Sequence, residues 1–574
     1  MTRPLVRHFR QIVLWPVQLM PLAPSEPCRG HWEVLDRMGP RSPWQELQDE
    51  FCDDDPDAFQ ERHYKEFVTF LPYAQRFLYG STAGQESASR RARSSLRVYR
   101  RGDIDAVRIQ LQPGGECWRL SVAHVDLCFF ADADVATVAF EMYADDLTLE
   151  VAQDILFRFG RAYPAYWESD GEGGNCPHRV EWLDAAGEVL AVSDYAAREK
   201  YLDWVVRHRT PHIAQHWEYL MAPFRPEFPG ETAPLRYRQL EYYRMPFLAY
   251  LAVDDPHALT RADFVRLGLV TRSGGAHDLP YAESTLTQFE AEHCDDRFWG
   301  RHGANSSADT RILCSGTTLA FVGTYGDKFY TGRETGLLGQ FRHQYFLLFL
   351  IAHFHKAAML SMSDELAVAM NRLDIEDTAS VKAFKRTIRQ MMEVFLRFTH
   401  RYYFSEVSTQ PLARSIFDRL RRHLGIDGLY EEVRKEVVDM NAYLDSDSAR
   451  RQANTVLRLT VVTVGGLVGT VATGLLGMNL LDESSRALGW RVGFFVITLA
   501  VVLVLTGLTI ANSKRLADAL DILSDQRTSW PEKWREFRAT GGKSSPPGLA
   551  SLTDAHRRAA ATKGERARRT TFGV

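Results

Sequence analysis

The chain has 574 residues, of which 45% are hydrophobic and 25% charged, and its mean hydropathy of −0.26 excludes a bundle made mainly of membrane helices. Its formal net charge of −4 excludes the strong basic bias of a nucleic-acid-binding protein. Its seven scattered cysteines have no CxxC spacing, which favours free thiols in a reducing compartment over a disulfide framework or a zinc finger.

Residues 1–95 form a mixed N-terminal segment that ends in a polar linker at 81–95. An apolar run near its start follows several arginines, as in a signal peptide. However, Pro16 and Pro21 interrupt this run, and no small-residue cleavage site follows it. The run therefore predicts a buried strand.

Residues 96–340 predict a cytoplasmic α/β domain. Four apolar runs at its start alternate or are rich in β-branched residues, which predicts a sheet; they are LRVYRR, AVRIQLQ, CWRLSVAHVDLCFF and VATVAFEMY. Helical spacing at 148–161 predicts a helix on this sheet, and residues 310–324 predict a further strand pair. The sequence of this domain contains no nucleotide-binding glycine loop and no catalytic Ser, Cys or His motif, so we expect no enzyme activity.

Residues 341–428 predict a helical region. The apolar run at 345–360 continues for only eight residues before His353, which indicates a core helix rather than a membrane span. We expect the histidines in and before this run to be packed or hydrogen-bonded rather than metal ligands: His343, His353 and His355. Pro411 permits a new helix to begin, and the glycines at 425 and 428 end it.

Residues 429–458 predict a stalk helix. Apolar residues recur there at alternating spacings of three and four, as in the a and d seam of a helix that meets copies of itself; they are Tyr430, Val433, Val437, Met440 and Leu444. No Pro or Gly occurs from 429 to 463, so we expect one helix to run from this seam into the apolar segment that follows.

Two uncharged runs near the C-terminus, residues 459–479 and 492–513, are each long enough to cross a hydrocarbon layer of about 30 Å. Residues 480–491 form a short external acidic hairpin loop, and residues 514–574 form a basic, partly disordered cytoplasmic tail. Basic residues flank both spans on the side away from the loop: Arg450, Arg451, Arg458, Lys514 and Arg515. This charge bias predicts a multi-pass inner-membrane protein with both termini in the cytoplasm.

Two spans in one chain cannot enclose an ion path, because a polar pore in lipid needs a closed protein lining. An oligomer can enclose one if each subunit contributes its first span to a central ring. The first span suits this role, because one helical stripe backward from Asn479 is mostly small or hydroxylated: Gly474, Thr470, Leu467 and Thr463. The second span is bulkier and more uniformly apolar, which favours an outer position facing lipid.

A stalk helix, a span that ends in Gly477-Met478-Asn479, a short acidic loop and a final span followed by basic residues resemble the CorA family of divalent-cation channels. The resemblance covers about Tyr402 to Arg515, and the first 340 residues and the long tail do not match visibly. The patterns along the chain predict an α+β cytoplasmic domain followed by a long stalk helix and a C-terminal two-helix transmembrane hairpin. The resemblance implies assembly as a homopentamer with its pore lined by the first span. The family's common Met-Pro-Glu element in the loop is replaced here by Leu481-Asp482-Glu483.

The resemblance also implies roles by position. The selectivity filter would be formed by Gly477, Met478 and Asn479. Polar pore rings would be formed by Gly474 and Thr470. The apolar constrictions that gate the pore would be formed by Leu467, Leu459 and Val456.

Mg²⁺ releases its waters reluctantly and requires octahedral oxygen geometry, so a channel does best to bind it hydrated. The carboxamide oxygens of Asn479 can accept hydrogen bonds from those waters, while Asp482 and Glu483 raise the cation concentration at the mouth. We expect Mg²⁺ and Co²⁺ as transported ions and no permanently bound cofactor. Three stalk carboxylates are candidates for regulatory Mg²⁺ binding: Asp439, Asp445 and Asp447.

Two other functions stay open at this point. One is a zinc transporter of the same superfamily, against which the Gly-Met-Asn tripeptide argues. The other is a membrane-anchored scaffold or signalling protein with a vestigial pore, in which the first span is a glycine-rich anchor packed through small residues. Ion flux separates a channel from a scaffold.

Overall fold

The structure is a computed structural model that describes the following residues: 4–23, 26–28, 30–47, 61–80, 95–241, 243–275, 277–300, 309–374, 377–477 and 487–511. The chain divides into two compact units, Met1–Asn441 and Ala442–Val574. The boundaries expected at 95, 340 and 428 all lie inside the first unit.

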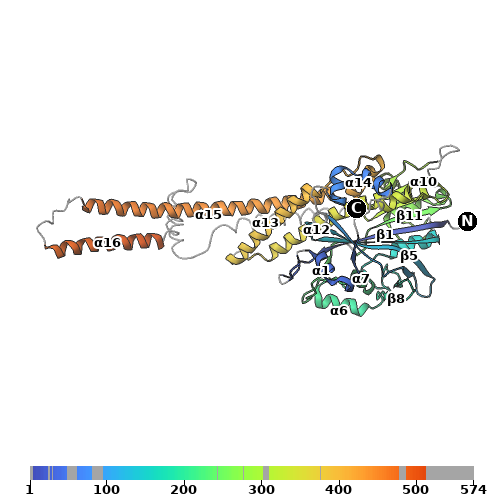
Figure 1. Ribbon diagram of the computed structural model, residues 1–574, viewed down its shortest axis with the longest axis horizontal. Coiled ribbons are helices and arrows are strands. Elements are labelled where there is room, and N and C mark those ends of the chain that lie inside the picture. The colour runs from blue at the N-terminus through green and yellow to red at the C-terminus, as the bar shows by residue number, and fades with distance from the viewer. Residues whose placement is uncertain are drawn as a thin grey trace. The chain divides into compact units, whose positions relative to one another are not determined.

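One large sheet organises the first unit (Figure 1). The described strands are β1 (Leu5–Leu19), β2 (Gln45–Glu46), β3 (Leu96–Arg101), β4 (Ala106–Gln110), β5 (Cys117–Phe130), β6 (Val135–Thr148), β7 (Arg179–Leu183), β8 (Val189–Val192), β9 (Arg225–Pro226), β10 (Arg236–Gln239), β11 (Phe247–Val253), β12 (Cys294–Asp295), β13 (Arg311–Cys314) and β14 (Thr318–Thr324). Their main path runs β12-β13-β14-β11-β1-β6-β5-β4-β7-β8. All neighbours on this path are antiparallel except β11 and β14, which are parallel.

The described helices of the first unit lie between its strands and after the last strand along the chain. They are α1 (His31–Met38), η1 (Gly39–Arg41), α2 (Glu61–Thr69), α3 (Pro72–Tyr79), α5 (Leu149–Arg158), α6 (Arg198–His208), α7 (Gln215–Met221), η3 (Pro256–Ala258), α8 (Arg261–Leu269), α9 (Glu283–His293), α10 (Lys328–Thr331), α11 (Leu337–Gln340), the π-helical turn η4 (Phe341–Tyr345), α12 (Phe346–Asn371), α13 (Thr378–Arg401) and α14 (Pro411–Leu424). Two further helices, α15 (Ile426–Gly477) and α16 (Leu488–Ala511), follow them.

The N-terminal apolar run is a buried strand, as predicted, and it lies near the middle of the sheet. β1 pairs with β6 along most of its length, from Leu5 opposite Thr148 to Gln18 opposite Val135. On its other edge β1 pairs with β11 up to Val13 and with β10 from Val17 onward. Pro16 lies between these two pairings, where its missing N–H removes no ladder hydrogen bond on that edge.

Helices cover both faces of the sheet. Side chains on β6 alternate between faces, so that Val138 and Phe140 belong to the main apolar core, and Glu141 points to the opposite face. The helix expected at 148–161 is α5, whose N-cap Thr148 accepts a hydrogen bond from the Val151 amide at 3.3 Å. α5 packs on β1 and β6, as does α12 from the other face.

α12 is the buried core helix that the sequence predicts. Together with the turns before it, Leu337–Asn371 is the one helix among the described residues that is long and apolar enough to cross a membrane, and 72% of its apolar window is buried. Within the described residues, the two expected spans contain only shorter apolar stretches, Thr455–Leu467 and Leu488–Thr498.

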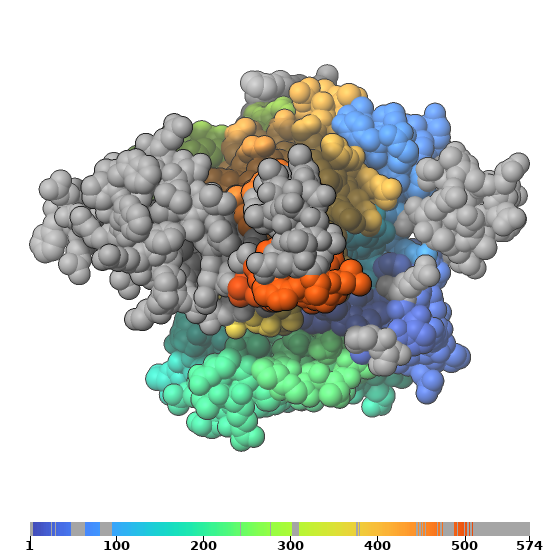
Figure 2. Space-filling view, turned by 90° about the vertical axis from the view of Figure 1, so that its left-hand side faces the viewer, coloured from blue at the N-terminus to red at the C-terminus, as the bar shows by residue number. Residues whose placement is uncertain are grey.

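The segment that leads into α14 packs beside α2 and α3, although more than 300 residues separate them (Figure 2). The Leu71 amide donates to the Val407 carbonyl at 2.9 Å, and Ser408 Oγ donates to the Thr69 carbonyl at 2.6 Å. The N-terminal segment is thus part of the first unit's helical layer. The protein is therefore of mixed α+β class, with a large sheet and a C-terminal helical region.

Candidate functional site

α15 is one unbroken helix of 52 residues, as the absence of Pro and Gly from 429 to 463 predicts. It begins directly after Gly425, whose φ of 66° closes α14 in the left-handed conformation. Gly428, expected to help end α14, lies inside the first turn of α15 instead. The uncharged run therefore continues the stalk helix as far as Gly477, the last described residue before a gap.

Six expected pore residues lie on one face of α15. At about 100° per residue they fall within an arc of about 80° and cover about 27 Å of helix length; they are Val456, Leu459, Thr463, Leu467, Thr470 and Gly474. We call these six residues the pore stripe. All six are exposed, including Leu459 at 66% and Leu467 at 63%. Its three large apolar side chains, Val456, Leu459 and Leu467, are each more than 60% exposed, which favours contact of this face with lipid or protein.

The hydroxyl groups of the two threonines in the pore stripe have defined hydrogen-bond directions. Thr463 Oγ1 donates to the Leu459 carbonyl at 2.8 Å, and Thr470 Oγ1 donates to the Gly466 carbonyl at 2.9 Å. Each hydroxyl proton is thereby held by its own helix, and the oxygen lone pairs stay free to accept. Such oxygens can accept hydrogen bonds from the water shell of a cation.

Several expected site residues lie outside the described residues. These are the filter residues Met478 and Asn479 and the acidic loop residues Asp482 and Glu483. Of the expected regulatory carboxylates, Asp439 is exposed on α15, and the side chains of Asp445 and Asp447 lie outside the description. No cluster of three or more His, Cys, Asp or Glu side chains able to hold a metal ion occurs among the described residues.

The first half of the expected oligomer seam packs within its own chain, so the interpretation as a self-association seam is wrong there. Tyr430 stacks on Tyr403 at 4.1 Å and on Phe395 of α13 at 5.6 Å between ring centroids. Val433 and Val437 are fully buried in the first unit. Periodic spacing indicates an apolar face, but it does not indicate whether the same chain or another chain covers that face.

The histidines around α12 are packed and paired, as expected. His343 Nδ1 lies 3.1 Å from a Glu66 carboxylate oxygen, and His353 Nδ1 lies 3.5 Å from one of Glu241. Burial lowers the pKa of His355 to about 3, so this imidazole is neutral and contacts the Tyr402 carbonyl at 2.5 Å. None of the three lies in a metal-binding cluster of the described part of the chain.

A buried charged cluster between the sheet and η4 has no counterpart in the sequence predictions. Glu141 on β6 is fully buried and binds Arg342 at 3.0 and 3.1 Å, His124 at 3.1 Å, and Arg10 of β1. Burial opposes ionisation of Glu141, but His124 and the two arginines outweigh it and lower its pKa to about 2. The only sequence signal is a polar residue at an inward position of two predicted strands.

The same cluster continues from Glu141 toward the edge of the sheet. His124 lies 3.1 Å from Asp126. Both carboxylate oxygens of Asp126 accept hydrogen bonds from Arg100, at 2.6 and 2.9 Å. Burial disfavours a charged His124, but the Asp126 and Glu141 carboxylates raise its pKa to about 9. Each charge faces an opposite charge, and this is the pattern of a structural cluster that fastens α12 to the sheet rather than of a reactive site.

No family model, no curated protein and no solved structure matches this chain. Function is therefore inferred from the chain's own residues.

Proposed function

We propose that this protein is a divalent-cation channel for Mg²⁺ and Co²⁺ that conducts hydrated ions through a homo-oligomeric membrane pore. In this proposal α15 supplies the pore-lining span, and α16 is the second helix of a transmembrane hairpin with both termini in the cytoplasm. A homopentamer is the assembly that the resemblance to CorA channels implies.

The observation that carries this proposal is the pore stripe on α15. Small, hydroxylated and apolar side chains share one face of a single helix, on a segment whose one charged residue is Arg458, and all six are exposed in the isolated chain. A ring of such helices encloses an apolar-walled pore with threonine oxygens at two levels. The exposed apolar surface of α16, which includes Phe495 and Ile497 at 63%, then faces lipid.

Hydrated Mg²⁺ suits this lining. The ion keeps its waters, so the pore needs acceptors for water protons rather than a dehydrating cage. Thr463 and Thr470 offer such acceptors, and a ring of Asn479 carboxamides at the outer end supplies more without a full charge to trap the ion. Asp482 and Glu483 in the loop would raise the cation concentration at the mouth.

Gating follows from the apolar members of the stripe. Rings of Val456, Leu459 and Leu467 stop conduction when they approach closely, because water leaves a narrow apolar constriction. Carboxylates on the stalk, Asp439 with Asp445 and Asp447, would bias this approach if bound Mg²⁺ screens their repulsion. Entry is passive and is favoured by membrane potential at about 2.3 kcal/mol per charge per 100 mV.

The test is Mg²⁺ and Co²⁺ uptake into liposomes that hold the purified protein, with Zn²⁺ measured in parallel. We expect Mg²⁺ uptake that an inert octahedral hexaammine complex blocks and that Asn479→Ala alters. Thr470→Val should reduce uptake about tenfold, because it replaces the hydroxyl with a methyl group. Thr470→Ser keeps the hydroxyl and should retain uptake. Uptake of Zn²⁺ alone would assign a zinc transporter, and absence of all flux would reject the channel.

A membrane-anchored scaffold is the second candidate, and one observation favours it. The seam residues Tyr430, Val433 and Val437 are covered within the chain, so they supply no contact for assembling stalks into an oligomer. A protein anchored by its two apolar helices and active through its large first unit needs no such contact. In this case the purified protein is monomeric and conducts no ion.

A further inference from the structure

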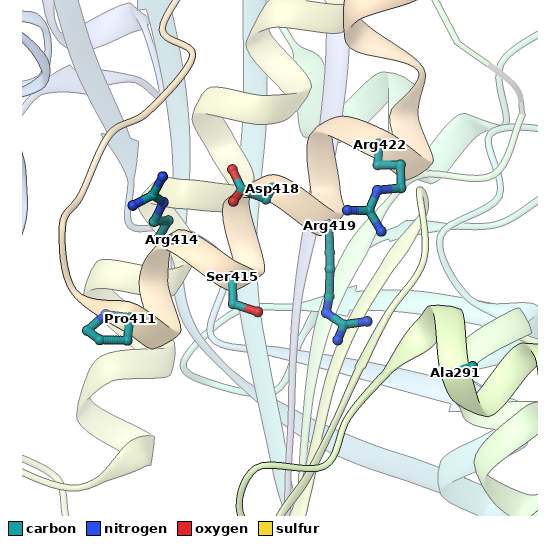
Figure 3. Close-up of a pocket in the computed structure, with 7 residues that line it drawn as sticks. All are labelled: Ala291, Pro411, Arg414, Ser415, Asp418, Arg419 and Arg422. Carbon is teal, nitrogen blue, oxygen red and sulfur yellow. The ribbon is translucent and has the colours of Figure 1, made fainter.

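A hollow of about 330 Å³ lies along one face of α14, against α9 (Figure 3). Its lining includes Ala291 of α9 and residues at helical spacing on α14: Arg414, Ser415, Asp418, Arg419 and Arg422. Sites for small ligands begin at about 300 Å³, so the hollow has room for a small organic anion. It is separate from the pore stripe and does not depend on the proposed channel.

The charges of this hollow are unbalanced. Its lining contains three guanidinium groups and one carboxylate, Asp418, so the formal charge of the lining is +2. Arg414 has a partner outside the hollow, since its Nε lies 3.3 Å from Glu406. Arg422 is exposed and makes no ion pair within the described part of the chain.

Arg419 is held in position without being neutralised. Its Nη1 donates to the Glu292 carbonyl of α9 at 2.8 Å. The nearest carboxylate, Asp295, lies 3.9 Å from its Nε and is already bound by Arg297 at 2.9 and 3.1 Å and by Ser415 at 2.9 Å. The side chain is therefore ordered by a neutral carbonyl, and most of its charge stays available.

The side chains of Arg419 and Arg422 are separated by three residues, so they project from the same face of α14. Figure 3 shows their guanidinium groups toward the Ala291 side of the helix, whereas Arg414 and Asp418 point away from it. Two guanidinium forks on one side of a hollow match the several oxygens of a phosphate group better than the single charge of a carboxylate. We propose that this hollow binds a phosphate monoester through Arg419 and Arg422.

The test is binding of glycerol phosphate to the purified full chain by calorimetry at constant ionic strength, since salt screens such contacts. We expect saturable binding that Arg422→Ala weakens at least tenfold through the loss of charge-assisted hydrogen bonds. Arg422 is exposed and outside any described ion pair, so its removal leaves the fold intact. Arg386→Ala, which removes an exposed arginine from α13, is the matched control and should bind as the parent does.

A second arm separates the sources of the phosphate group. Equal affinity for glycerol phosphate and for soluble short-chain phosphatidic acid assigns a free phosphoester, and at least tenfold tighter binding of the latter assigns a lipid headgroup. Absence of saturable binding of either probe, or equal affinity of Arg422→Ala and the parent, overturns the proposal.

Discussion

Arg342 Nε on η4 lies 3.0 Å from Glu141 Oε1 on β6, although 201 residues separate them in the chain. Arg342 belongs to the turn that precedes α12, and Glu141 lies on the face of the sheet that α12 covers. Because Glu141 is fully buried, its charge must be met by Arg342, Arg10 and His124. This cluster therefore fixes where the helical layer meets the sheet.

Glu141→Gln should destabilise the protein by about 3 kcal/mol or more, because it leaves buried cations without their counter-charge. The measurement is urea unfolding of the purified chain, followed by tryptophan fluorescence. Glu188→Gln is the matched control, since Glu188 is exposed in a turn, and it should change stability by less than about 0.5 kcal/mol. Equal stability of the two variants would show that the cluster does not hold the layers together.

Stability should also fall at alkaline pH because of His124. Its pKa is raised to about 9 in the folded protein, against about 6.5 when unfolded, so its contribution is complete below pH 6.5. The contribution disappears as pH rises through 9 and is on the order of 3 kcal/mol. Unfolding free energies at pH 6, 8 and 10 measure the loss, and the His124→Gln variant should lose less stability over this range than the parent does. An identical pH profile in both proteins would exclude this role.

Local pattern predicted some strands well. The runs LRVYRR and CWRLSVAHVDLCFF coincide with β3 and β5 at both ends, because each run contains apolar and aromatic residues and no Gly or Pro. The neighbours of a strand carry no such signal. Nothing in β1 alone indicates that it pairs with β6 and β11, more than 100 and 200 residues away.

The candidate site was predicted in part for the same reason. Helical spacing is local, so the pore stripe from Val456 to Gly474 could be read from the sequence, and the continuous helix α15 places it on one face. The partner of an apolar seam is not local. Val433 and Val437 therefore matched a self-association pattern, although Tyr430 beside them stacks on residues of the first unit.

Val437→Ala tests this internal packing of the seam. Removing two buried methyl groups should cost about 2 kcal/mol of stability and leave the size of any oligomer unchanged, because the chain itself already buries Val437. Urea unfolding and light scattering measure the two effects. Val438→Ala is the control, since the neighbouring side chain is 49% exposed and should have little effect on stability. A smaller particle for Val437→Ala than for the parent would show that the seam is an interface between subunits.

Leu467→Asn tests the pore stripe as a gate. A carboxamide at this level keeps water in the constriction, so Mg²⁺ leak under closed conditions should rise about tenfold in liposomes.

Val464→Asn is the matched control: Val464 is 54% exposed on α15 and lies about 100° from the centre of the stripe. It introduces the same polar group into the same apolar segment, so any general weakening of α15 affects both variants. A rise in Leu467→Asn alone supports a pore along the stripe. Equal leak in both variants would mean that this face of α15 does not line the ion path.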